Sequence, residues 1–213
     1  MVLLRLEEPR ALEKAIATLQ HGGVVAYPTD TVYGIGASIN YPGALSRIFE
    51  IKGRKAEASL PLLMASSADL GKVSTGVDPL LLALASRFWP GSLTVAVPGK
   101  ASLPPQVLAA DGTVGVRVPA HSVALTLAQR VGGVLATTSA NLSGQPPATR
   151  ASEIAQLLRS RLDLILDGGI SRNGMASTVI RQEGDTIHII REGAIPAETI
   201  QAAWRLVQAA ARK

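Results

Sequence analysis

Helix-like and strand-like patterns of apolar residues alternate along the whole chain. Residues 2–6 and 24–27 are short apolar runs typical of strands, whereas apolar residues recur every three or four positions over residues 11–19. Gly22 and Gly23 follow this predicted helix, and glycine is common there because it readily adopts the left-handed conformation after a helix end. The start of the chain therefore predicts a strand, a helix and a second strand.

The remaining segments continue the alternation. Helices are predicted over 43–53, 67–72, 78–89, 121–131, 151–160 and 196–211, and strands over 60–65, 92–97, 114–118, 133–137, 163–167, 177–182 and 186–191. The last two strands flank residues 183–185, a turn sequence typical of a hairpin. No linker of domain-separating length is present, and no segment repeats with a period of about 20–50 residues. We therefore predict one α/β domain over residues 1–213, built on a mixed sheet.

Composition excludes several classes of protein. Hydrophobic residues make up 47% of the chain, which is too many for a disordered protein. The absence of cysteine excludes a thiol nucleophile, an iron–sulfur cluster and a zinc ribbon. The net charge is +5, but only 3% of residues are aromatic, which argues against a platform that stacks nucleic-acid bases. The charge is better suited to a phosphorylated small molecule or to shallow phosphate contacts with RNA.

The pattern near residue 1 is not that of a secretion signal, because Glu7 and Glu8 directly follow the short apolar run. The longest apolar run, residues 79–85, is much shorter than the ~20 residues that a membrane span requires. We therefore expect a cytoplasmic protein without membrane contact.

Common catalytic motifs are missing from the sequence. There is no phosphate-binding G-x-x-x-x-G-K-[ST] loop, no G-x-S-x-G elbow and no H-E-x-x-H zinc motif. Gly34 and Gly36 begin a dinucleotide-binding pattern, but Ile39 occupies the place of its third glycine. The histidines His21, His121 and His188 are too scattered for a metal site. Only His121, which follows an arginine-bearing strand end, is kept as a functional candidate.

Polar residues gather instead where predicted elements end. The segment 28–34 leaves a buried strand and carries Thr29, Asp30, Thr31 and Tyr33. One interpretation is an ordinary turn in which Asp30 and Thr31 bond their own backbone. The other is a ligand-binding loop, since the glycine at its end would let a ligand approach the backbone. Both interpretations stay open at this point.

Two groups of cations have the same ambiguity. Lys52, Arg54 and Lys55 follow a predicted helix, where they could simply interact with the helix dipole. They could also clamp a triphosphate, with Arg54 as a bidentate donor and Lys52 as a point charge opposite the leaving pyrophosphate. Arg117 lies between Val116 and Val118 in an apolar strand, and a buried arginine needs an anion.

Three further polar groups complete the set. Ser139 and Asn141 follow the strand 133–137, Ser177 begins the strand 177–182, and Arg191 ends the strand that pairs with it. Such residues are frequent in ordinary loops, but hydroxyl and amide groups at the carboxyl end of a strand also suit phosphate or nucleotide binding. With no standard nucleophile among them, these clusters indicate catalysis by binding and orientation, as in nucleotidyl transfer.

Taken in chain order, these motifs resemble the YrdC-like family. The matching stretches are 28–34, Lys52-x-Arg54, 116–119, 139–141, 177–179 and Arg191-x-Gly193, so the resemblance runs from about residue 10 to residue 200. It implies a single-domain protein with a twisted mixed β-sheet flanked by helices and a large basic cavity. It also implies the reaction of the best-understood members, in which L-threonine, bicarbonate and ATP give threonylcarbamoyl-AMP and pyrophosphate. That reaction is the first step of the t6A modification of tRNA.

The resemblance also implies roles for individual residues. Thr31, Ser139 and Ser177 would bind L-threonine, while Lys52, Arg54, Asn141, Thr149 and Arg191 would bind ATP. Arg117 would bridge the two sites, and Lys52, Arg54 and Arg117 would act in catalysis by screening negative charge. Mg²⁺ is expected with ATP. The expected partners are these substrates, a downstream threonylcarbamoyl transferase and tRNA.

The chain departs from the family pattern at a few positions. Lys55 stands where many members have proline, and Arg181 stands where an acidic residue is frequent. Leu63 and Met64 occupy a strand on which some members place a histidine. The alternative function is therefore a non-catalytic, RNA-binding paralogue of the YrdC/YciO type. The retained residues 139–141 favour the enzyme, because the paralogous branch tends to lose them.

Overall fold

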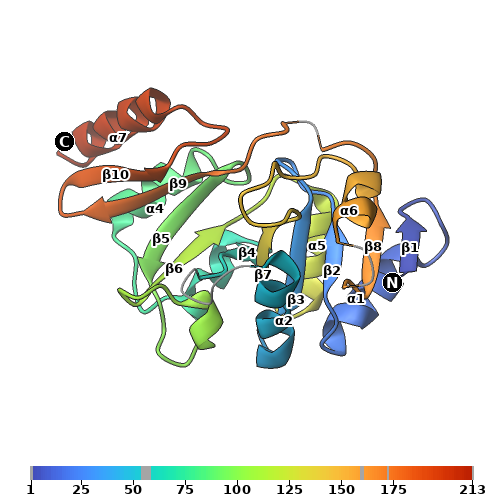
Figure 1. The fold of residues 1–213 in the computed structure, drawn as a ribbon. Coiled ribbons are helices and arrows are strands. Elements are labelled where there is room, and N and C mark those ends of the chain that lie inside the picture. Colours follow the sequence, from blue (N-terminus) through green and yellow to red (C-terminus); the bar gives the residue numbers. More distant parts are fainter. Residues whose placement is uncertain (1, 54–58, 159–160, 172, 213) are drawn as a thin grey trace.

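Ten strands of the described chain form one mixed sheet with helices on both of its faces (Figure 1). The structure is a computed structural model that describes residues 2–53, 59–158, 161–171 and 173–212. The strand order is β1-β8-β2-β3-β7-β4-β6-β5-β9-β10, with both parallel and antiparallel neighbours. The predicted α/β fold is confirmed.

The elements lie close to the predicted ranges. The strands are β1 (Val2–Arg5), β2 (Val25–Tyr27), β3 (Gly34–Ser38), β4 (Leu62–Met64), β5 (Leu93–Pro98), β6 (Thr113–Arg117), β7 (Val134–Ser139), β8 (Leu164–Asp167), β9 (Thr178–Glu183) and β10 (Thr186–Arg191). The α-helices are α1 (Ala11–Gln20), α2 (Pro42–Lys52), α3 (Leu70–Val73), α4 (Pro79–Ser86), α5 (Ser122–Arg130), α6 (Ala151–Leu157) and α7 (Ala197–Ala211). Short 3₁₀ helices lie at Ser67–Asp69 and Pro105–Val107. No helix in the described ranges is both long enough and apolar enough to cross a membrane.

Strand β3 has no counterpart in the prediction. It lies between β2 and β7 and pairs with both in antiparallel fashion. Its residues Gly34, Gly36 and Ala37 have weak intrinsic preference for strands, so no strand pattern is visible there. A Cβ at Gly36 would lie 3.0 Å from the hydroxyl oxygen of Tyr27. The glycines of β3 thus make room for the buried Tyr27 ring, and the neighbouring strands rather than local propensity determine β3.

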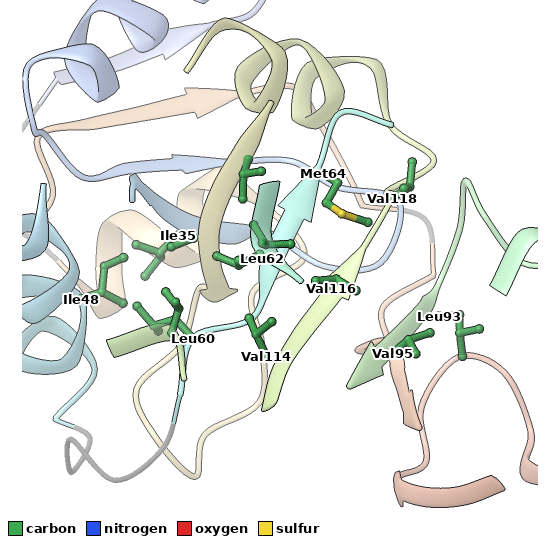
Figure 2. Packing of buried hydrophobic residues seen from close by; sticks show 14 of the residues in the cluster. Ile35, Ile48, Leu60, Leu62, Met64, Leu93, Val95, Val114, Val116 and Val118 are labelled. Atoms are coloured by element: carbon green, nitrogen blue, oxygen red, sulfur yellow. The ribbon is translucent and has the colours of Figure 1, made fainter. Parts of the chain in front are cut away.

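Two apolar clusters hold the helices against the sheet. One contains buried residues of α1 and α5 together with Leu63 and Leu135. The other contains buried residues of α2, α4, α6 and α7, and it includes Leu62, Met64 and Val116 (Figure 2). Because successive side chains of a strand point to opposite faces, Leu62 and Leu63 of the same strand enter different clusters.

An ion pair outside these clusters joins α2 to the start of β8. Asp163 accepts hydrogen bonds from Arg47 Nη1 at 3.0 Å, from Arg47 Nη2 at 3.1 Å and from the backbone N–H of Val24 at 2.7 Å. Partial burial raises the pKa of the Asp163 carboxyl, but the Arg47 and Val24 hydrogen bonds outweigh it and hold that pKa below its usual value. This carboxylate is a structural contact between distant parts of the chain.

Strands β5, β6 and β9 bury one set of side chains and direct the other set into a cavity. On β6, Val114 and Val116 belong to the core (Figure 2). Thr113, Gly115 and Arg117 of the same strand line the cavity. The period of two along a strand explains this division. The sheet therefore provides the floor of the candidate site.

Candidate functional site

The cavity has a volume of about 710 Å³ and collects most of the predicted site residues. Its described lining includes Thr31, Lys52, Arg117, Ser139, Asn141, Ser177 and Arg191, which come from six motifs of the sequence, with Ser139 and Asn141 in the same one. The charged side chains among the described lining residues are Lys52, Arg117, Arg181, Arg191 and Asp111. A cavity of this size is in the range of small-molecule and cofactor sites.

Arg117 lies at the end of β6 and is only 6% exposed. Its Nη2 donates to Asp30 Oδ1 at 2.6 Å, its Nη1 donates to Thr31 Oγ1 at 3.1 Å, and its Nε donates to the carbonyl oxygen of Gly91 at 2.8 Å. Burial lowers the pKa of the Arg117 guanidinium, and the charge of Asp30 opposes this shift. The anion that a buried arginine requires is thus supplied by the chain itself.

The Thr29 hydroxyl organises the loop 28–34. Its oxygen accepts hydrogen bonds from the backbone N–H of Thr31 at 3.1 Å and of Val32 at 3.3 Å, and it donates to the Val32 carbonyl at 2.6 Å. The loop is therefore a turn, as one interpretation holds, but Thr29 rather than Asp30 makes the local bonds. The Asp30 side chain is directed to Arg117 instead, and the Thr31 hydroxyl contacts both Arg117 and, at 2.9 Å, the Thr29 hydroxyl.

Lys52 ends α2 and is 4% exposed. Its ammonium donates to the carbonyl oxygen of Ser139 at 2.6 Å, to that of Asn141 at 2.9 Å and to Asn141 Oδ1 at 3.1 Å. An ammonium has three N–H donors, and these three contacts are all to oxygen atoms of one turn. Lys52 therefore stabilises the turn 139–141 by hydrogen bonds and also lines the cavity.

The side chains of this turn are also bonded to one another. Ser139 Oγ donates to Asn141 Oδ1 at 2.6 Å, and Asn141 Nδ2 donates to the carbonyl oxygens of Leu142 at 3.0 Å and Gln145 at 2.5 Å. In the pairing of β3 with β7, Ser139 lies opposite Gly34 at the end of the loop 28–34. The two polar segments are thus adjacent, although about a hundred residues separate them in the chain.

A third polar group lies on β5, β9 and β10. The hydroxyl oxygens of Ser177 and Thr94 are 2.8 Å apart, and Arg191 Nη2 donates to the Ser177 carbonyl at 2.7 Å and to Ser177 Oγ at 3.3 Å. Thr94 was not predicted as a site residue. The available signal was its position between Leu93 and Val95, because a polar residue on the alternate face of an otherwise apolar strand faces something other than the core.

The structure does not bring every candidate to the cavity. Thr149 is absent from the described lining, and its backbone N–H donates to Glu153 Oε2 at 2.7 Å at the start of α6. Arg54 and Lys55 lie outside the described residues. His121 directly precedes α5, does not line the described cavity, and buries its Nδ1 without a hydrogen-bond partner in the described ranges. Burial lowers the pKa of His121, although the charge of Asp30 opposes this.

Arg181 is a lining residue that the sequence marked only as a departure from the family pattern. Its Nη1 donates to Asp111 at 2.8 Å, and its Nη2 contacts Glu183. Since Arg117 and Arg181 are both paired with carboxylates, the basic character expected for the cavity remains a prediction. Its hydroxyl-rich lining, by contrast, is a direct observation.

Comparison with known proteins adds an independent line of support. The model of the family Sua5_yciO_yrdC, described as "Telomere recombination", matches residues 17–193. This chain belongs to the Sua5/YciO/YrdC family. One relative is a threonylcarbamoyl-AMP synthase of Pyrococcus abyssi (strain GE5 / Orsay), which is 38% identical to this chain over 197 residues. The match covers 92% of this chain but 58% of that protein.

Solved structures of the Sua5/YciO/YrdC family agree with the fold. The crystal structure of P. abyssi Sua5 complexed with L-threonine superposes with a TM-score of 0.88 and 36% identity, covering 95% of this chain and 60% of that one. E. coli YciO superposes with a TM-score of 0.83 and 28% identity, covering 93% of this chain and 98% of that one. This chain thus spans less than two thirds of P. abyssi Sua5 but nearly all of YciO.

Proposed function

We propose that this chain is a threonylcarbamoyl-AMP synthase, an ATP-dependent nucleotidyltransferase that acts in the t6A modification of tRNA. The observation that carries the proposal is the single cavity in which Thr31 with Arg117, the turn 139–141 with Lys52, and Ser177 with Arg191 meet. The relatives named as this synthase, and the solved Sua5 complexed with L-threonine, support the same activity and substrate.

The reaction needs no protein nucleophile. The amine of L-threonine attacks bicarbonate, which gives the N-carboxylated amino acid and water. An oxygen of this carbamate then attacks the α-phosphorus of ATP, and the bond from that phosphorus to the pyrophosphate oxygen breaks. Both steps join negatively charged reactants, so the chain contributes mainly by holding them together and by offsetting their charge.

The proposed residue roles are those that the resemblance to the YrdC-like family implies. Thr31, Ser139 and Ser177 present hydroxyl groups to the substrate L-threonine, whose own hydroxyl a buried polar partner can select. Asn141, Lys52 and Arg191 serve the nucleotide, with Arg117 between the two substrates. Arg54, outside the described residues, and Thr149, outside the described lining, keep their assignment to ATP as predictions only.

Mg²⁺ is part of the proposal and would enter with ATP. In the described part of the chain, no three His, Asp or Glu side chains gather to hold a metal ion. Mg²⁺ in nucleotide sites is usually held by substrate phosphates with one or two carboxylates, and Asp111 is the carboxylate among the described lining residues. In that position the ion would supply charge neutralisation on the phosphates.

Pyrophosphate release tests the proposed function. The purified chain is incubated with ATP, bicarbonate and Mg²⁺, with L-threonine, L-serine or L-valine as the amino acid. We expect release that depends on L-threonine and that the other two amino acids support poorly, because each lacks one group of the threonine side chain. Release that does not depend on L-threonine would contradict the proposal.

A non-catalytic RNA-binding paralogue of the YrdC/YciO type is the second candidate, and this chain matches YciO over 98% of its length. Such a protein would bind tRNA through its cations and would release no pyrophosphate. Pyrophosphate release separates the two functions, and titration of tRNA binding against salt tests the RNA contact itself, because phosphate contacts give a steep loss of affinity with rising salt. A tRNA contact, transfer of the product to a downstream threonylcarbamoyl transferase and a cytoplasmic location belong to the enzyme proposal.

A further inference from the structure

A buried ion pair lies beside the threonine end of the cavity. The side chains of Asp30 and Arg117 are only 11% and 7% exposed, and their charged atoms are 2.6 Å apart. They come from the loop 28–34 and from the end of β6, elements that are distant in sequence. A buried charge without its partner would carry a large cost in free energy, so each of these two side chains restricts the position of the other.

The donors of Arg117 show what this constraint achieves. A guanidinium carries five N–H groups in one rigid plane. The Nε–H donates to Gly91, one N–H of Nη1 donates to Thr31, and one N–H of Nη2 donates to Asp30. Three contacts in three directions fix the plane of the group, and one N–H remains on each Nη atom. Arg117 can therefore bind a substrate anion without releasing the contacts that orient it.

Asp30 itself does not belong to the described lining of the cavity. Its Oδ1 accepts from Arg117, and its Oδ2 accepts from the Ser92 hydroxyl at 3.4 Å. His121 is a further ionisable neighbour, and the Asp30 charge raises its pKa against the effect of burial. Any influence of Asp30 on a bound substrate is thus transmitted by Arg117 and by the Thr31 hydroxyl that Arg117 contacts.

We propose that Asp30 is a positioning residue for the amino-acid substrate: it holds Arg117 and Thr31 in the arrangement that recognises L-threonine. This proposal rests on the proposed function for the identity of the substrate. It distinguishes Asp30 from the residues assigned to ATP, because the hydrogen bonds of Lys52 and Arg191 involve other parts of the cavity wall. Loss of the Asp30 charge should therefore impair threonine recognition selectively.

Asp30→Asn and Asp30→Glu test this inference, with Asp163→Asn as a matched control. Asp163 also pairs with an arginine, but outside the cavity, so its variant removes a carboxylate charge without touching the site. We expect Asp30→Asn to raise KM for L-threonine about tenfold or more and to leave KM for ATP within about twofold. Asp30→Glu keeps the charge at a shifted position and should raise KM for L-threonine about threefold. Asp163→Asn should change neither constant.

Calorimetric titration of L-threonine into each variant separates this inference from the proposed function. If the wild type binds L-threonine but releases no pyrophosphate, the enzyme proposal fails while the binding data still test Asp30. Equal rises in KM for both substrates, or unchanged threonine binding in a folded Asp30→Asn variant, would overturn the positioning role. If Asp30→Asn does not fold, Asp30→Glu decides, and wild-type threonine affinity in that variant overturns the role. A wild type that does not bind L-threonine overturns both proposals.

Discussion

Arg117 and Lys52 are buried to nearly the same degree, yet the chain satisfies them in different ways. Arg117 pairs with the carboxylate of Asp30, whereas the hydrogen bonds described for Lys52 go to oxygen atoms of Ser139 and Asn141. Two cations in the same cavity thus have different described contacts, a carboxylate for Arg117 and the oxygens of a turn for Lys52. Burial alone therefore does not reveal the role of a cation.

The number of donors explains the consequence of this difference. Arg117 has five N–H groups and uses three, so it can bind a substrate anion while its orientation is kept. Lys52 has three N–H groups, and the oxygens of the turn 139–141 are sufficient to engage all of them. A phosphate that binds Lys52 would have to displace one of these oxygens or share a hydrogen atom with it. We infer that Lys52 serves the nucleotide mainly by shaping the turn 139–141, whereas Arg117 contacts substrate directly.

Replacing Arg117 by lysine should have the largest effect. Arg117→Lys keeps a positive charge opposite Asp30 but loses the planar fork that also contacts Thr31 and Gly91. We expect kcat/KM for L-threonine to fall about a hundredfold or more, while calorimetric titration still detects ATP binding. An Arg117→Lys variant with nearly full activity would show that charge alone suffices at this end of the cavity.

Replacing Lys52 by methionine tests the other side of the comparison. Lys52→Met retains the approximate length of the side chain but removes the ammonium that donates to the carbonyl oxygens of Ser139 and Asn141 and to Asn141 Oδ1. We expect a loss of about 2–4 kcal/mol in the free energy of unfolding, measured by urea denaturation. ATP affinity should fall as well, because the turn 139–141 loses its support. Unchanged stability together with lost ATP affinity would show instead that Lys52 acts as a direct phosphate ligand.

The Asp163→Asn variant measures how much an ion pair outside the cavity contributes to the free energy of unfolding. Half-exposed pairs are screened by water, so we expect a loss of about 1 kcal/mol in the free energy of unfolding at neutral pH. The pKa of Asp163 is lowered by folding, so its contribution is present above the unfolded value of 3.8 and is lost as the pH falls through the folded value. Urea denaturation between about pH 7 and pH 3 should show a smaller decline in the Asp163→Asn variant than in the wild type. An equal decline in both proteins would exclude this contribution.

His121 should produce the smallest effect. Its folded-state pKa lies below the usual 6.5, so the unfolded chain binds a proton first as the pH falls. The free energy of unfolding should therefore decrease slightly as the pH drops below about 7, until the folded-state pKa is reached. A His121→Gln variant should lack this component in urea denaturation between about pH 7 and pH 5. If the variant keeps the pH dependence of the wild type, that dependence originates from a group other than His121.

The sequence predicts the fold well where burial is periodic along the chain. The helices α1, α2, α5 and α7 and the hairpin of β9 and β10 lie near their expected ranges because each has a clear apolar face or a turn signal. Strand β3 is invisible in the sequence because its glycines serve the packing of Tyr27, a contact that depends on tertiary structure. Local patterns cannot reveal such a strand.

The site was predictable as a set of residues but not as a set of contacts. Seven candidates, among them Thr31, Lys52 and Arg117, line one cavity, since each of their motifs lies at an element end. The pairing of Arg117 with Asp30 and the contact of Thr94 with Ser177 required the strand order, which joins segments far apart in the chain. Thr149 had no periodic or strand-end signal of its own, and its described contacts are at the start of α6.

The central claim is that one cavity joins L-threonine, bicarbonate and ATP. The most direct measurement is mass spectrometry of the nucleotides formed from ATP, L-threonine and ¹³C-labelled bicarbonate with Mg²⁺. We predict an adenylate that contains threonine and the labelled carbon, formed together with pyrophosphate and at a strongly reduced rate in the Arg117→Lys variant. Formation of AMP without a labelled adduct, or no turnover in the presence of all three substrates, would contradict this account.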